Sequence, residues 1–501
     1  MAPVDLWKGE LMDRFHAFIF ANEQARAPCI YGLTIGAFIY YDLSYANKSD
    51  FQTISDRLVA IVKAAVHLQY LDFRTFISDS VFDAMVKLTT LHELHIITDV
   101  PTYEEKLLKH LAIFHSPLRS LHIAGNEFSG SNMPASFLHD RLSHLTPTLE
   151  FLDLDEFPVD ILPSSVTTQF TAVRSLKLRA TFAPDCDLLG VLLRLFPKLD
   201  NTLELGSLYD SVRGDNVPAF RTRCQEAQER HRWSRLDRLA CHADTAYLLA
   251  LRCPIRRMEI QVRLPDATQY LAETLRYHCP PHLYVSISFN NGFGALDRLF
   301  PPEATDKLTH LVVFADIRIR HGRRSIRRNR GDSVHSGDRF VNRLLNSIQD
   351  LHLTHLRIVF HYSTYLQARK TAPDADSVGH NPLGDGMDLQ ATKARFVDAM
   401  PTLEYLFLTA SSQTYAIPSQ KRLWEFSSEI LSKWFASKAW RVVHGGEDLH
   451  PSESISESDV GIGSSVELSR EAAERIMDRE ELQLSRDEEY EVRLCADPKG
   501  S

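Results

Sequence analysis

One short pattern of apolar residues, apolar-x-x-apolar-x-apolar, recurs along most of this chain. Its clearest copy spans residues 118–126 and reads LRSLHIAGN, with the apolar positions at Leu118, Leu121 and Ile123. Other copies begin at Leu68, Leu91, Leu149 and Val173, and weaker ones continue to Leu403. A side chain on a strand faces the side opposite to its neighbour's, so each copy predicts a short strand with one buried face.

Between these copies the apolar residues follow helical spacing, as in residues 188–196 and 340–348. Each unit therefore predicts a strand, a turn and a helix, and the second apolar positions recur about every 23 to 31 residues, close to a leucine-rich repeat. We predict an α/β fold, a leucine-rich-repeat solenoid with irregular repeats, in which a curved parallel sheet carries helices on its convex side. A doubly wound sheet is the alternative that alternating strands and helices leave open.

The pattern divides the chain into three regions. Residues 1–67 predict an N-terminal helical cap, with an amphipathic helix over 5–22, and a first irregular repeat. Residues 68–440 predict the solenoid, with loop insertions at about 318–339 and 361–389 and a final capping helix over 421–440. Residues 441–501 predict an acidic, largely disordered tail with at most a marginal helix.

Charge is concentrated at the C-terminal end of the chain. The formal net charge is −9, and residues 447–501 contain 16 acidic against 6 basic side chains, so the remainder is nearly neutral. A nucleic-acid-binding protein relies on a broad basic face that neutralises phosphates. We therefore expect no nucleic-acid partner.

Several features favour a cytoplasmic or nuclear protein without a membrane anchor. Asp5, Glu10 and Asp13 interrupt the apolar residues of the first turns, unlike a secretory signal. No stretch reaches the roughly 18 apolar residues that cross a bilayer. The seven cysteines are scattered and never form C-x-x-C, which favours reduced thiols over disulfides or a zinc framework.

The first insertion is strongly basic. Its arginines are Arg318, Arg320, Arg323, Arg324, Arg327, Arg328 and Arg330. This basic loop predicts either a nuclear-localisation signal or a contact for an acidic partner. The alternative is a solvated insertion that pairs with the acidic tail.

No constellation for catalysis emerges. Gly292 and Gly294 follow a predicted strand, but Asp297 occupies the third glycine position of a dinucleotide-binding turn and would repel a pyrophosphate. His92 and His95 point to opposite faces of a predicted strand, so they cannot share a metal ion. We expect no enzyme activity, no cofactor and no metal site.

Recognition is the function that the strands favour. Residues flanking the second apolar position should point to the concave face and bind a protein partner, since they mix charges with aromatic rings. This predicted site comprises Tyr70, Asp72, Glu93, His95, His122, Phe151, Asp153, Lys177, Glu204, Glu259, Arg357 and Tyr405. The same reasoning adds Ser120, Arg238, Arg257, His310, His355 and Phe407. The alternative is that these are merely solvated positions on a polar sheet face.

The chain resembles the irregular leucine-rich-repeat proteins of mushroom-type fungi, most of which look like F-box substrate receptors. The resemblance rests on Leu6-Trp7, on residues 15–18 (FHAF), on residues 29–33 (CIYGL), and on the degenerate triplets over 68–408. It implies a substrate receptor of a cullin-type ubiquitin ligase, with the ligase adaptor as a partner, although the F-box itself is not recognisable. The alternative is a stand-alone interaction scaffold. In either case we expect a monomer.

Overall fold

The computed structural model describes most of the chain. The described residues are 2–36, 48–74, 78–97, 109–124, 137–155, 168–179, 187–208, 212, 216–263, 267–289, 293–297, 299–321, 337–367, 387–417, 429–444 and 465–496. They form two compact units, the first made of Met1–Cys241 and Leu248–Pro254, the second of His242–Tyr247 and Ile255–Ser501. No helix among them is long and apolar enough to cross a membrane.

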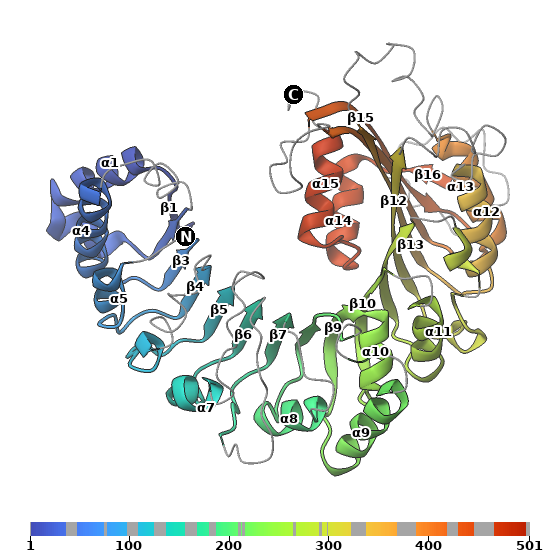
Figure 1. The fold of residues 1–501 in the computed structure, drawn as a ribbon. Coiled ribbons are helices and arrows are strands. Elements are labelled where there is room, and N and C mark those ends of the chain that lie inside the picture. The colour runs from blue at the N-terminus through green and yellow to red at the C-terminus, as the bar shows by residue number, and fades with distance from the viewer. Residues whose placement is uncertain are drawn as a thin grey trace. The chain divides into compact units, whose positions relative to one another are not determined.

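The first unit is an α/β structure whose strands are parallel and lie in chain order (Figure 1). Its strands are β1 (Val4–Leu6), β2 (Gly32–Ile35), β3 (Tyr70–Phe73), β4 (Glu93–Ile97), β5 (Ser120–Ala124), β6 (Phe151–Asp155), β7 (Ser175–Arg179), β8 (Thr202–Leu205) and β9 (Leu236–His242). Its helices are α1 (Gly9–Phe20), α2 (Glu23–Arg26), η1 (Ala27–Cys29), α4 (Lys48–Ala64), α5 (Asp79–Met85), α7 (Phe137–Leu142), η2 (Ser143–Leu145), α8 (Leu188–Leu195) and α9 (Asn216–Arg230). Helices α4 to α9 cover one face of this sheet.

The apolar triplets form the core of the first unit, as the pattern predicts. In β4, Leu94 and Ile96 are buried while Glu93 and His95 are half-buried, and β5 repeats this alternation. The register stacks the second leucines strand by strand, with Leu94 beside Leu121 and Leu121 beside Leu152. Strand order follows the chain without the reversal that characterises a doubly wound sheet.

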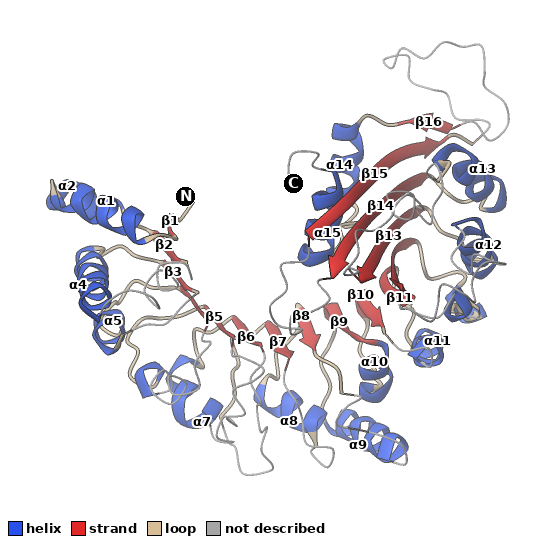
Figure 2. Cartoon of the chain, turned by 45° about the horizontal axis from the view of Figure 1, so that its top comes forward, coloured by secondary structure: helices blue, strands red, loops and turns tan. Residues whose placement is uncertain are grey.

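The second unit continues with longer strands (Figure 2). They are β10 (Ile255–Val262), β11 (His282–Phe289), β12 (His310–His321), β13 (His355–Gln367), β14 (Tyr405–Ile417), β15 (Glu429–Val442) and β16 (Ser465–Glu467). Strands β10 to β14 pair in parallel, whereas β15 and β16 each pair antiparallel with the strand before. The helices are α10 (Ala243–Leu249), α11 (Ala267–Tyr277), η3 (Phe293–Leu296), η4 (Pro302–Ala304), α12 (Gly337–Ile348), α13 (Leu389–Ala399), α14 (Arg470–Arg479) and α15 (Arg486–Ala496).

Three expectations for the second unit were wrong, one about the type of an element and two about where a strand ends. The predicted capping helix over 421–440 is instead strand β15 from Glu429 onward, because this segment pairs along the whole of β14. Strand β12 continues to His321, so Arg318 and Arg320 belong to a strand rather than to the start of a loop. Strand β13 likewise takes in residues 361–367 of the second predicted insertion.

The acidic tail differs most from expectation. Residues 465–496, predicted to be largely disordered, form β16, α14 and α15, and both helices lie on the face of the sheet opposite α11, α12 and α13 (Figures 1 and 2). Ser469 caps α14 by accepting a hydrogen bond from the backbone nitrogen of Ala472. Residues 445–464 and 497–501 lie outside the described residues.

Candidate functional site

In the first unit, the sheet register brings six of the predicted site residues into one line across six strands. Each residue is paired with the next on the neighbouring strand, and we call this line the polar row: Asp72, His95, His122, Asp153, Lys177 and Glu204. Tyr70, Glu93 and Phe151 belong to the adjacent line of the same face, which also contains Ser120. The sequence prediction for these nine residues therefore describes one continuous surface.

The first half of the polar row is organised around a buried carboxylate. Asp72 is almost completely buried and accepts a hydrogen bond from Arg74 Nε at 2.9 Å. The Tyr70 ring packs edge-on against His95, with ring centroids 5.4 Å apart. Burial lowers the pKa of His95, although its contact with Glu93 at 2.9 Å acts in the opposite direction. This part of the face is therefore a preformed arrangement of rings and charges.

The second half of the row is a chain of polar contacts, with ion pairs from Asp153 to Glu204. Asp153 Oδ2 lies 2.8 Å from His122 Nδ1 and 3.8 Å from Lys177 Nζ. Lys177 Nζ also lies 3.4 Å from Glu204, which accepts a hydrogen bond from Arg179 at 2.8 Å. From Asp153 to Glu204 the row thus alternates in charge, and Lys177 remains partly exposed.

Two residues at the next outward-facing position extend this half of the row. Arg179 and Asp155 lie 3.3 Å apart, and burial raises the pKa of Asp155. The sequence prediction stopped at the residues flanking each second leucine and missed this pair. One further step of the same alternation along β6 and β7 would have included both.

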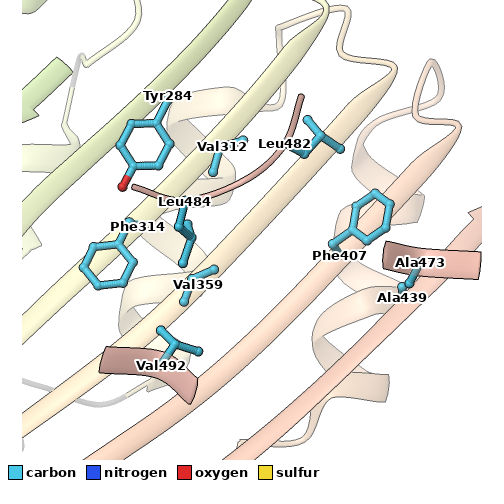
Figure 3. Packing of buried hydrophobic residues seen from close by; sticks show 10 residues of the cluster. All are labelled: Tyr284, Val312, Phe314, Val359, Phe407, Ala439, Ala473, Leu482, Leu484 and Val492. Atoms are coloured by element: carbon cyan, nitrogen blue, oxygen red, sulfur yellow. The ribbon is translucent and has the colours of Figure 1, made fainter. Parts of the chain in front are cut away.

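The corresponding face of the second unit is covered by the C-terminal segment, residues 465–496. Figure 3 shows the apolar contact between them. The sheet contributes Tyr284, Val312, Phe314, Val359, Phe407 and Ala439, and the segment contributes Ala473, Leu482, Leu484 and Val492. We call this surface of the sheet the covered face. The predicted site residues Glu259, Arg357 and Tyr405 all belong to it, so they contact this segment or lie beside those that do, rather than forming an open surface.

Polar contacts hold the C-terminal segment at defined points. Arg357 is only 5% exposed, donates a hydrogen bond to the backbone oxygen of Leu482 at 2.7 Å, and lies 3.3 Å from Glu489. Burial lowers the pKa of Arg357, and Glu489 opposes that shift. Arg256 donates to both carboxylate oxygens of Glu481 at 2.7 and 3.1 Å. The acidic composition of the segment therefore complements arginines on the sheet.

A column of rings crosses the covered face beside the end of α14. His282, His310, His355 and Tyr405 stack in order, with successive centroids 4.0, 4.3 and 4.9 Å apart. Glu480 reaches this column, and its Oε2 lies 3.4 Å from Nε2 of His310. His310, His355 and Glu480 place their ligand atoms within 4.8 Å of one another, so the three residues could hold one metal ion. Sequence spacing gave no sign of this group, because its members come from three distant segments.

Little of the basic loop can be placed. Arg318 donates a hydrogen bond from Nε to Asp316 at 2.6 Å at the end of β12, and the backbone of Arg320 belongs to the same strand. The remaining arginines, Arg323, Arg324, Arg327, Arg328 and Arg330, lie outside the described residues.

Comparison with known proteins adds no assignment. No protein-family model matches the chain, and no curated protein matches its sequence.

Proposed function

We propose that this chain is a protein-recognition module of the leucine-rich-repeat solenoid type, which binds its partner through the polar row of the first unit. The fold interpretation is supported by parallel strands in chain order and by buried leucines stacked strand by strand. Such a sheet presents an extended face built from many strands, which is the surface that solenoid proteins use for binding.

The polar row is the main observation that supports this proposal. Its polar groups are held by neighbours on the same strand or on adjacent strands, so little side-chain freedom remains to be lost when a partner binds. Tyr70 and Phe151 are half-buried on the same face, and aromatic rings are enriched at the centres of protein interfaces. A mixture of rings and paired charges favours a protein surface over a phosphate backbone.

The balance of charge favours a basic partner segment. Over β3 to β8 the face carries the acidic side chains Asp72, Glu93, Asp153, Asp155 and Glu204, against the basic Arg74, Lys177 and Arg179. Opposite charge on the partner would steer its approach and fix its register along the row. We therefore propose a partner that presents lysine or arginine.

Affinity capture with charge-reversed variants tests this proposal. Glu93→Lys changes the face at a side chain that is 42% exposed, while Glu229→Lys on α9 is a control on the helical side, 64% exposed. Partners captured from cells that make the protein should be lost with the first variant and kept with the second. Capture of the same proteins by both variants would contradict the proposal.

A more specific function, substrate receptor of a cullin-type ubiquitin ligase, is supported by the family resemblance alone. The residues that carry the resemblance at the start of the chain lie in β1, α1 and β2 or directly beside them. Co-precipitation of the full-length natural protein with the ligase adaptor tests it. If the adaptor is absent while other partners are captured, a stand-alone interaction scaffold is the better account.

A further inference from the structure

We propose that His310, His355 and Glu480 bind a divalent transition-metal ion, zinc in the first instance, which fastens the C-terminal segment to the sheet. The proposal concerns the second unit alone and does not depend on the recognition function of the first.

The backbone places the three ligands side by side. His310 and His355 are register partners at the starts of neighbouring parallel strands, β12 and β13. Glu480 is the residue directly after α14, and the helix brings it over the two rings. Zinc bonds of about 2.0–2.1 Å in a tetrahedron set ligand atoms about 3.4 Å apart. Nε2 of His310 and Oε2 of Glu480 already lie 3.4 Å apart.

The hydrogen bonds of both rings fit the tautomer that a metal needs. The Thr309 hydroxyl donates to the backbone oxygen of Pro281 at 3.2 Å, so its own oxygen accepts from Nδ1 of His310 at 2.8 Å. The Thr354 hydroxyl donates to the backbone oxygen of Thr309 at 3.2 Å, and its own oxygen accepts from Nδ1 of His355 at 2.9 Å. Protonation at Nδ1 leaves the Nε2 lone pair free on both rings. Protein ligands to zinc are oriented in this way by their second nitrogen.

Apart from Glu480 beside His310, the free Nε2 atoms have no partner among the described residues. Both Nε2 atoms are buried without a hydrogen bond, and His355 as a whole is only 7% exposed. A buried acceptor left without a partner costs free energy. A metal ion at this point would give each lone pair a bond.

The Glu480 carboxylate is also oriented to bind a metal ion at this point. Oε1 of Glu480 accepts a hydrogen bond from Arg479 Nε at 2.7 Å, which leaves Oε2 directed at the rings. Two imidazole nitrogens and one carboxylate oxygen form a donor set that suits zinc, with water completing the tetrahedron.

Metal binding would join two strands to the end of α14. The segment is otherwise held by apolar packing and by the arginine contacts described above. An ion that binds only the docked arrangement stabilises it by RT ln(1 + c/Kd), where c is the ion concentration, so the stabilisation grows with the logarithm of that concentration.

Zinc titration of the full-length, chelator-stripped protein tests the proposal, with calorimetry for stoichiometry and cobalt spectroscopy for geometry. Glu480→Gln and His355→Phe each remove one ligand, and phenylalanine preserves the ring stack. His282→Phe is the matched control, since this histidine belongs to the same column but lies outside the three-ligand group. Thr354→Val should weaken binding by about 10–100-fold, because it removes the group that orients His355.

We expect one equivalent of zinc in the wild type and in His282→Phe, and its loss in the other two single ligand variants. Hydrogen exchange in α14 and α15 should slow on adding zinc to the wild type but not to Glu480→Gln. Circular dichroism will show which variants fold; Glu480 is partly exposed, so Glu480→Gln keeps the test open if His355→Phe unfolds. Failure of the wild type to bind one equivalent, or full retention of that equivalent in Glu480→Gln and His355→Phe, would overturn the site and leave only adventitious binding by other histidines.

Discussion

Arg357 and Leu482 are joined by a hydrogen bond of 2.7 Å from a guanidinium nitrogen of β13 to a backbone oxygen between α14 and α15. This bond connects the middle of the sheet to the C-terminal segment at the point where the segment turns. It is nearly free of solvent, since Arg357 is buried and Leu482 is 1% exposed.

Arg357→Ala should destabilise the second unit by about 3–5 kcal/mol, because it breaks a largely buried ion pair and leaves the buried Leu482 oxygen without its donor, although Glu489 keeps its contact with Arg493. Arg357→Met should cost clearly less, since it fills the same volume with apolar atoms. Urea unfolding of both variants measures the difference. An equal loss of unfolding free energy in the two variants would contradict the described contributions of packing volume and charge pairing.

Leu482→Ala should lower the free energy of unfolding by about 2–5 kcal/mol through the lost burial and the cavity left behind. Tyr490→Ala on α15 is the control, because its side chain is 63% exposed and should change stability by no more than about 0.5 kcal/mol. If the two substitutions cost the same, Leu482 is not part of a packed contact.

Stability should fall on acidification between about pH 6.5 and pH 4. Burial, with the charge of Arg318, lowers the pKa of His361 to about 4, so the folded chain holds the ring neutral while the unfolded chain takes up a proton first. The contribution of the neutral His361 ring to the free energy of unfolding is complete above about pH 6.5 and is lost as the pH falls toward 4. In total it amounts to about 3 kcal/mol.

Unfolding measured at a series of pH values in the presence of a chelator checks this sign. His361→Gln should flatten the slope without removing it, because burial also lowers the pKa of His282 and of His355 to about 4. A wild-type stability that rises on acidification through this range would contradict the assignment.

Deletion of residues 465–501 should expose the apolar side of the covered face. Val312, Phe314, Val359 and Phe407 would then form a contiguous exposed patch, and such patches drive association. Light scattering should report oligomers or aggregates for this variant, whereas deletion of 497–501 alone should leave the wild-type behaviour. A soluble, monomeric and equally stable deletion variant would show that the segment covers nothing essential.

The first unit was largely predictable because its signal is local. Alternation such as that around Leu94 and Leu121 assigns a face to every side chain, so one strand at a time suffices to locate the core and the polar row. Parallel stacking in chain order then aligns His95 with His122 and with Asp153. The prediction missed only the next outward-facing position along each strand, which includes Arg179.

The second unit was less predictable because its arrangement depends on contacts between distant segments. The apolar residues around Trp434 fit helical spacing as well as a strand, and only the pairing with β14 decides between them. Residues 465–496 are so highly charged that their few apolar residues do not suggest a core.

A local signal for α15 was nevertheless present. Ser485 and Glu488 form a capping box: the Ser485 hydroxyl accepts from the Glu488 backbone nitrogen at 3.4 Å, and Glu488 accepts from the Ser485 nitrogen at 3.2 Å. The spacing S-x-x-E at 485–488 could have predicted the helix, but not the face on which it lies.

Hydrogen exchange of the full-length protein tests the central structural claim, that the acidic C-terminal segment is folded onto the sheet. We expect the backbone amides of α14 and α15 to exchange much more slowly than those of an isolated peptide spanning 465–496, and Arg357→Ala to remove much of that protection. Exchange at the rate of the isolated peptide in the intact protein would contradict the account.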